Sequence, residues 1–160
     1  ISTGLIIGIV STFILLLWRI SRPHIAVIGQ IEGTQHFRNI QRHHVLTSSK
    51  LLSMRIDENL NFLNAHIFKG FLIIAVSQHI DLEHVVINCS SISSIDLSAV
   101  EMLEDVNAEL NKLNIKLHLS EIKGPVMDKL QHSKLLKHLS GKIYLTHFQA
   151  MQQLSPEVFQ

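Results

Sequence analysis

The sequence predicts an α/β domain, a mixed sheet flanked by helices, preceded by a helix that spans a membrane. Two observations carry this prediction. The first 18 residues, ISTGLIIGIVSTFILLLW, are apolar and have no charge before Arg19. Beyond them, short β-branched runs alternate with segments whose apolar residues recur every three or four positions. This alternation is typical of strands connected by helices that pack on the sheet.

The opening stretch is long enough to be a membrane anchor. At about 1.5 Å per residue, residues 1–18 make a helix of roughly 27 Å, slightly short of a hydrocarbon core of about 30 Å. Trp18 suits the membrane interface, Arg19 and Arg22 suit its cytoplasmic edge, and Pro23 is expected to stop the helix. A signal peptide would carry basic residues before the apolar run, so that alternative is disfavoured. A buried core helix is the other alternative.

Strands are expected wherever short runs are β-branched or alternate between apolar and polar residues. The polar stretch 30–50 has no clear period and is expected to lie outside the regular elements. Turn residues such as Gly29 and Asp57 bound several of the runs. The predicted strands are 25–28, 51–56, 61–65, 84–89, 115–119 and 143–145.

Helices are expected wherever apolar residues form one stripe. Pro125 fits the first turn of a helix, and Thr146 with Gln149 forms a capping box for a closing helix. Ser98 with Glu101 forms a second capping box, at the start of the helix that follows SSISSID. The predicted helical stripes are 67–75, 100–113, 126–130 and the segment after 146.

Composition excludes several classes of function. The net charge of +1 gives no field for nucleic acid, and Cys89, the single cysteine, has no partner for a disulfide. The eleven histidines are scattered, with His43 and His44 the only adjacent pair and no metal-binding spacing. Neither a GxSxG elbow nor a P-loop is present. We therefore expect no catalytic residue, no metal, no cofactor and no nucleic-acid partner, in a protein that is not an enzyme.

Asp96, Ser98, Ala99 and Glu101 form the most informative local group. A helix that begins at Ser98 presents unpaired N–H groups and a partial positive charge, which can hold a phosphate or another anion. A phosphate on Ser98 would add a charge of about −1.5 to −2 beside Asp96 and Glu101. The alternative is that Ser98 only caps its helix, a contribution of roughly 1 kcal/mol.

Two longer segments carry a family resemblance. The first runs from Arg22-Pro23 through Gly33-Thr34 and FRN (37–39) to RID (55–57) and LNFLNA (60–65), and the second is VVINCSSISSIDLSA (85–99). Together they resemble the junction and the STAS domain of SulP sulfate permeases. The sequence departs from the family pattern at Asn39, at NLNF (59–62) and at Ala99, where aspartate, Pro-Leu-Tyr-Phe and glycine are usual.

The resemblance implies a division of the chain into three parts. Residues 1–19 would be the end of the last transmembrane helix of a longer protein, an expectation that suits a chain starting with Ile1. Residues 20–50 would be the junction, first strand and loop, and 51–155 the remainder of a cytoplasmic STAS domain. The whole protein would then be a multi-pass secondary transporter in the cell membrane that moves sulfate or a related anion.

The role that the resemblance implies for this part is regulation, assembly or partner docking, without contact to the anion. Asp96, Ser98, Ala99 and Glu101 would be the regulatory or partner-binding residues. The expected partners are the upstream membrane domain, a second copy in a homodimer and a cytosolic regulatory protein. In anti-sigma factor antagonists, which share the STAS fold, the residue matching Ser98 is phosphorylated. A membrane-tethered antagonist of that type is therefore the alternative function.

Overall fold

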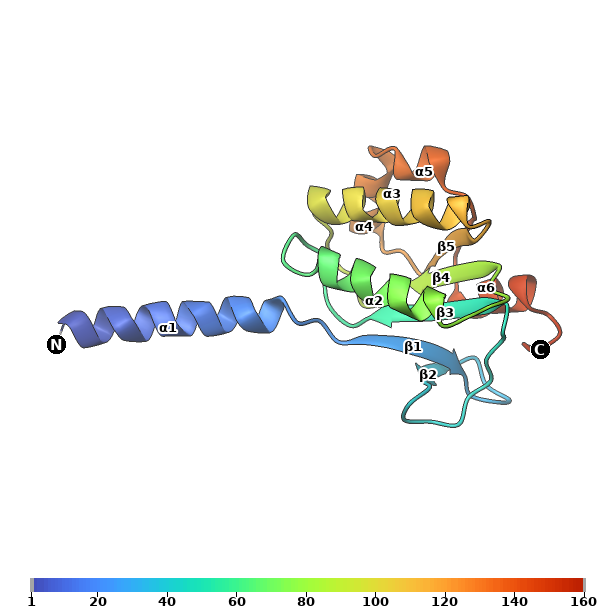
Figure 1. The fold of residues 1–160 in the computed structure, drawn as a ribbon, viewed down its shortest axis with the longest axis horizontal. Helices are drawn as coiled ribbons and strands as arrows, with labels where there is room; N and C mark the ends of the chain where they lie inside the picture. The colour runs from blue at the N-terminus through green and yellow to red at the C-terminus, as the bar shows by residue number, and fades with distance from the viewer. Residues whose placement is uncertain (1, 160) are drawn as a thin grey trace.

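A six-stranded mixed sheet forms the centre of the molecule, and one long helix stands apart from it (Figure 1). The computed structural model describes residues 2–159. The strands are β1 (Ile25–Gln30), β2 (Phe37–Asn39), β3 (Leu51–Ile56), β4 (His84–Asn88), β5 (Lys116–Ser120) and β6 (Ile143–Tyr144). The helices are α1 (Ser2–Ile20), α2 (Ala65–Ser77), α3 (Leu97–Lys112), α4 (Gly124–Gln131), α5 (Leu135–His138) and α6 (His147–Leu154).

The order of strands in the sheet is β2-β1-β3-β4-β5-β6. β1 runs antiparallel to both of its neighbours, whereas β3 to β6 are mutually parallel. Helices α2 and α3 contact β3 and β5, and α6 contacts β4 and β6. Two hydrophobic cores result. The larger packs α2 and α3 against one face of the sheet, and the smaller packs α6 against the other. Each fully buried large apolar side chain contributes about 1.5–3 kcal/mol.

Helix α1 contributes nothing to either core. None of its residues is buried, and large apolar side chains such as Leu5 and Leu15 are each 64% exposed. By length and hydropathy it is able to cross a membrane, and within residues 2–159 it is the one helix that is. The alternative of a buried core helix is therefore wrong for this structure. Near its end, the Arg22 guanidinium lies 4.5 Å from the centre of the Trp18 ring.

The anchor joins the domain at the edge of the sheet where the parallel strands end. Because β1 starts just after the anchor and runs antiparallel to β3, the start of β1 lies beside the end of β3. The N–H of Asp57 donates to the carbonyl of His24 at 2.9 Å, and Nδ1 of His24 lies 2.8 Å from Oδ2 of Asp57. We call this the carboxyl edge. In Figure 1, α3 also begins on the side of the domain from which α1 extends.

Two buried histidines, His118 and His147, lie against residues of the smaller core. The ring of His147, which is 1% exposed, lies between two serines, with Nε2 2.5 Å from Oγ of Ser53 and Nδ1 2.7 Å from Oγ of Ser120. His118 accepts the N–H of Lys142 at Nδ1, 3.0 Å away. Its other nitrogen, Nε2, must then carry the proton and donate to Nδ1 of His84, 3.1 Å away. The hydrogen bond from Lys142 thus requires a neutral ring at His118, and burial, which lowers the pKa of His147, favours the neutral ring there.

Most predicted elements are confirmed, and three differences stand out. Residues 61–65 do not form a strand, because the side chains of Asn61 and Asn64 accept backbone N–H groups and turn the chain into α2. The stretch 30–50 contains β2, a three-residue edge strand that pairs with β1. The four-residue helix α5 was not predicted either. Short elements of this kind carry too few residues to show a period.

Candidate functional site

The loop between β4 and α3 is fixed in place by the segment that follows β3. Oδ1 of Asn59 accepts the N–H groups of Ser93 and Ser94, at 2.8 and 3.0 Å. Leu60 forms an isolated bridge with Ile95. Bonds from Asn59 and Leu60 thus add to the loop's own turn, in which the N–H of Ile92 donates to the carbonyl of Cys89 at 3.0 Å, and the loop presents the start of α3 at the carboxyl edge.

Asp96, and not Ser98, caps helix α3. Oδ1 of Asp96 accepts the N–H of Ala99 at 2.9 Å, and Oδ2 accepts the N–H of Phe62 at 2.7 Å. The predicted capping box of Ser98 with Glu101 is therefore wrong. Aspartate and serine are both good caps. The backbone conformation decides between them, because the chain is still extended at Asp96 and the helix begins with the next residue. The carboxylate also occupies the position at this helix terminus where an anion was expected to bind.

The other predicted site residues have different surroundings. Ser98 and Glu101 are exposed, and being three residues apart they share one face of the helix. Ala99 is completely buried in the larger core, so it supports the helix start rather than offering a side chain to a partner. The structure thus brings Asp96, Ser98 and Glu101 together at one accessible corner of the domain.

Replacing Asp96 by alanine should destabilise the domain by about 1–3 kcal/mol, because two backbone N–H groups lose their acceptor. Urea unfolding followed by circular dichroism measures this free energy. Ser98→Ala is the matched control and should change it by less than about 0.5 kcal/mol, since Ser98 is exposed and does not cap the helix. A larger loss for Ser98→Ala than for Asp96→Ala would restore Ser98 as the cap.

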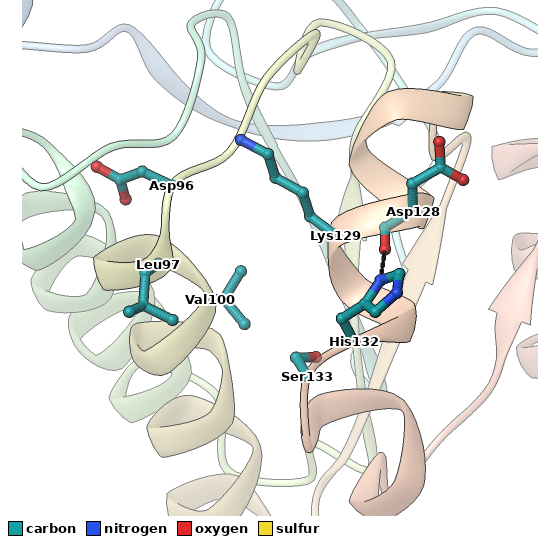
Figure 2. A pocket seen from close by; sticks show the side chains of 7 residues that line it. All are labelled: Asp96, Leu97, Val100, Asp128, Lys129, His132 and Ser133. Atoms are coloured by element: carbon teal, nitrogen blue, oxygen red, sulfur yellow. Dashed lines mark hydrogen bonds between the residues drawn. The ribbon is translucent and has the colours of Figure 1, made fainter.

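A pocket of about 600 Å³ adjoins this corner, between the start of α3 and the end of α4 (Figure 2). Leu97 and Val100 give it an apolar wall, and the side chain of Leu97 is 73% exposed. Nζ of Lys129 donates to the carbonyl of Ile95 at 2.8 Å, which ties α4 to the loop. The remaining lining comes from α4 and the turn after it, from Asp128, His132 and Ser133.

The chemistry of this corner favours binding over catalysis. Nδ1 of His132 lies 2.6 Å from the carbonyl oxygen of Asp128, and Oγ of Ser133 donates to the carbonyl of Leu130, so neither is paired as base and nucleophile. Within residues 2–159, no three His, Cys, Asp or Glu side chains are arranged to hold a metal ion. An apolar wall with charged groups at its rim suits the side chain of another protein segment.

Cys89 lies behind the loop and is buried. Burial raises the pKa of its thiol to about 12, so the thiol stays protonated and unreactive near neutral pH. The pocket residues Leu97, Lys129 and His132 were not predicted as site residues. In the sequence, only the apolar Leu97 next to Asp96 indicated a pocket at this position. Lys129 and His132 come near Leu97 only through the packing of α4 on α3.

A comparison with protein families decides the assignment. Residues 38–150 match the model of the STAS domain. The chain belongs to the STAS domain family. The domain is 29% identical, over 94% of this chain, to sulfate transporter 3.2 of Arabidopsis thaliana. The predicted resemblance to sulfate permeases is thereby confirmed. The chain spans about a quarter of the length of that curated relative.

Solved structures show the same fold. The structure of the murine Solute Carrier 26 family member A9 anion transporter, in the inward-facing state, matches 96% of this chain with a TM-score of 0.83 at 14% identity. The match covers 26% of that transporter. The STAS domain of a SulP transporter from Vibrio cholerae matches 74% of this chain and 91% of its own, with a TM-score of 0.57 and 17% identity.

Proposed function

We propose that this chain is the last transmembrane helix and cytoplasmic STAS domain of a secondary-active transporter of sulfate or a related small anion. The observation that carries the proposal is a fully exposed apolar helix of 19 residues joined directly to a STAS domain, in a chain aligned along nearly its whole length with a sulfate transporter. In this proposal residues 1–19 lie in the membrane, 20–50 form the junction, and 51–155 complete the domain.

The role of the domain is regulatory, and the corner at Asp96, Leu97, Ser98 and Glu101 is its docking surface. The surface opens at the carboxyl edge, where the anchor also attaches. The part of the protein nearest to it is therefore the membrane domain of the same chain or of a second copy. We propose this membrane domain as the partner, with its cytoplasmic loops placing an apolar side chain against Leu97 and Val100.

Uptake of labelled sulfate tests the transport function. The intact protein that carries this chain, expressed in cells that lack their own sulfate permease, should restore uptake, and uptake should fall when residues 21–160 are removed. Uptake of labelled sulfate and of related small anions that stays at the background level, although the protein reaches the membrane, would contradict the proposal.

Leu97→Asp and Ser98→Asp test the docking surface. Each puts a carboxylate in the first turn of α3, which the helix tolerates, but adds charge beside Asp96 and Glu101 at the surface. Uptake at equal surface expression should change about fivefold or more, the lower end of ordinary coupling between sites. Ser49→Asp is the matched control, because Ser49 is exposed just before the start of β3, at the opposite edge of the sheet. Equal uptake in all three variants would contradict a docking role.

A phosphorylation-switched, membrane-tethered antagonist is the second candidate, because Ser98 presents an exposed side chain at the start of α3. Phosphate found on Ser98 by mass spectrometry of the protein from its own cells, together with absence of sulfate uptake, would favour this candidate over the transporter.

A further inference from the structure

Helix α2 carries two apolar stripes, and the second of them is exposed. The first, which includes Leu72, is buried in the larger core. The second contains Phe71 and Ile74, which are 38% and 62% exposed. It lies on the side of α2 away from α3, because Lys69, on the other side, reaches Glu109 of α3, with Nζ 2.7 Å from Oε1. A helix that is apolar all round is normally covered all round, so within residues 2–159 this stripe is left without its cover.

A groove of about 300 Å³ lies beside this stripe, between α2 and the antiparallel side of the sheet. Ile25 and Val27 of β1 line it together with Ile40, which follows β2 and is 41% exposed. None of the ten residues around the groove carries a charge. A charged group placed there would lose its water without gaining a counter-ion, so the groove suits an apolar occupant. We call the exposed ridge of Phe71 and Ile74, together with this groove, the β1–α2 strip.

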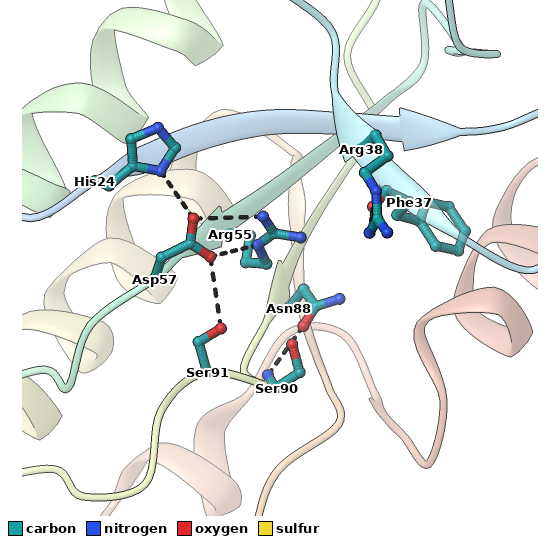
Figure 3. Close-up of polar contacts among 8 residues, drawn as sticks. All are labelled: His24, Phe37, Arg38, Arg55, Asp57, Asn88, Ser90 and Ser91. Carbon is teal, nitrogen blue, oxygen red and sulfur yellow. Dashed lines mark hydrogen bonds and ion pairs between the residues drawn. The ribbon is translucent and has the colours of Figure 1, made fainter. Parts of the chain in front are cut away.

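Polar contacts at the carboxyl edge hold the start of β1, and with it the end of the anchor, against the sheet (Figure 3). Oδ2 of Asp57 lies 2.8 Å from Nδ1 of His24, and Oδ1 accepts from Nε of Arg55 at 2.5 Å. The hydroxyl of Ser91 adds a longer bond to Oδ1, at 3.5 Å. Burial by itself would raise the pKa of Asp57, but hydrogen bonds from Arg55 and His24 outweigh it and hold that pKa below its usual value. Asp57 is thus ionised near neutral pH and keeps both of these bonds.

The direction of the β1–α2 strip relative to the anchor is therefore fixed. Helix α2 connects the parallel strands β3 and β4, so it runs against them and in the same direction as β1. Both elements lead away from α1 and roughly along its line (Figure 1). Two copies anchored in one bilayer have the same orientation, so a two-fold axis that relates them is perpendicular to the membrane. With α1 across the membrane, this axis runs roughly parallel to the strip, and the strip can meet its own copy along its length.

We propose that the β1–α2 strip is the contact surface between two copies of this chain in the membrane. Ridge and groove lie side by side, so a two-fold rotation places the ridge of each copy, Phe71 and Ile74, in the groove of the other, against Val27 and Ile40. A free domain would need an interface of about 800 Å² per partner, but confinement to one membrane raises the effective concentration and lets a shorter strip suffice. The inference rests on the membrane anchor of the proposed function. It does not depend on anion transport or on the docking surface at Ser98.

Cysteine cross-linking of the chain in lipid vesicles, at a low ratio of protein to lipid, tests the surface. Ile74→Cys places a thiol on the ridge, and a short bismaleimide should join two such chains into a covalent dimer. Cys89 does not interfere, because its thiol is buried and stays protonated. Ile80→Cys is the matched control. Ile80 is 98% exposed but follows the end of α2, at the opposite edge of the sheet from the anchor, so its variant should give no more dimer than the unaltered chain.

Energy transfer between copies labelled with two fluorophores measures the strength of pairing. Ile74→Glu would bury a carboxylate without a partner and should weaken pairing about tenfold or more, whereas Ile80→Glu should leave it unchanged. Both positions are exposed, so neither variant disturbs the core. The proposal is overturned if Ile74→Cys cross-links no better than Ile80→Cys, if Ile74→Glu pairs as tightly as the unaltered chain, or if Ile74→Cys in the intact protein is cross-linked only within one chain. Neither measurement uses sulfate, so a failure of uptake would contradict the transport function alone.

Discussion

Acidification from about pH 7 to about pH 4.5 is expected to unfold the domain, because two buried histidines must take up protons. Burial, aided by the nearby charges of His84 and Lys116, lowers the pKa of His118 to about 4, and burial with Arg55 lowers that of His147 to about 3. In the unfolded chain both titrate near 6.5. Below that pH the unfolded state binds protons that the folded state excludes.

The free energy of unfolding should therefore change little between about pH 6.5 and about pH 8, and it should fall below about pH 6.5 by about 1.4 kcal/mol per pH unit for each of these two histidines. The lowered pKa of His84 adds to this loss in the same direction. By about pH 4.5 the loss reaches about 5 kcal/mol, comparable with the whole stability of many domains. Urea unfolding at several pH values measures the slope. Asp57 does not interfere, because its pKa is lowered from 3.8 and its contribution is lost only below that range.

His118→Gln removes one titrating group and should lower the slope by about 1.4 kcal/mol per pH unit. The exposed His36 offers the matched control, and His36→Gln should leave the slope unchanged. Stability that stays flat as the pH falls from about 7 to about 5 would show that these rings are not held neutral in the folded protein.

Gly141→Ala is expected to cost about 2–3 kcal/mol or more, since no space exists for the added methyl group. A Cβ at this position would overlap the carbonyl oxygen of Leu117 and lie 2.6 Å from Nδ1 of His118. The strand β5 and the loop before β6 would have to separate. The bond from the N–H of Lys142 to His118 would be lost with them. Thermal and urea unfolding measure the loss.

Gly70→Ala is the control for this substitution. Gly70 lies on the exposed side of α2, and a Cβ there meets nothing within 4 Å. Alanine should stabilise the helix by about 0.5–1 kcal/mol, because glycine loses more conformational freedom on folding. Two glycine-to-alanine changes of opposite sign would confirm that the close contact at Gly141, and not the loss of glycine, sets the effect. Equal effects of the two would contradict it.

The elements that were predicted correctly are those whose pattern is local and long. β3, β4 and β5 have β-branched or alternating runs, and α3 repeats its apolar residues over four turns. The local order of apolar and polar residues is therefore enough to predict these elements. The prediction of a strand at 61–65 is wrong, and the local pattern gives it little support, because the apolar Phe62 and Leu63 are adjacent and do not alternate with polar residues. The asparagines of this segment decide otherwise, through side-chain bonds that the apolar pattern does not reveal.

The candidate site was predictable only in part. The sequence points to the loop before α3, but it does not distinguish Asp96 from Ser98 as the cap, because both types accept the same N–H groups. The pocket beside Leu97 depends on where α4 packs. Contacts between segments that are far apart in the sequence leave no pattern in the local sequence.

The way in which the anchor joins the sheet has a mechanical consequence. Figure 1 shows α1 continuing almost in line with β1, whose first half, Ile25–Val27, pairs with β3 and whose second half, Ile28–Gln30, pairs with β2. A pulling force transmitted from the bilayer would therefore act along the strand, so that the hydrogen bonds of the ladder resist it together in shear. A force at right angles to the strand would instead break them one after another. Movements of the anchor along its own axis are thus transmitted to the whole sheet without peeling it apart.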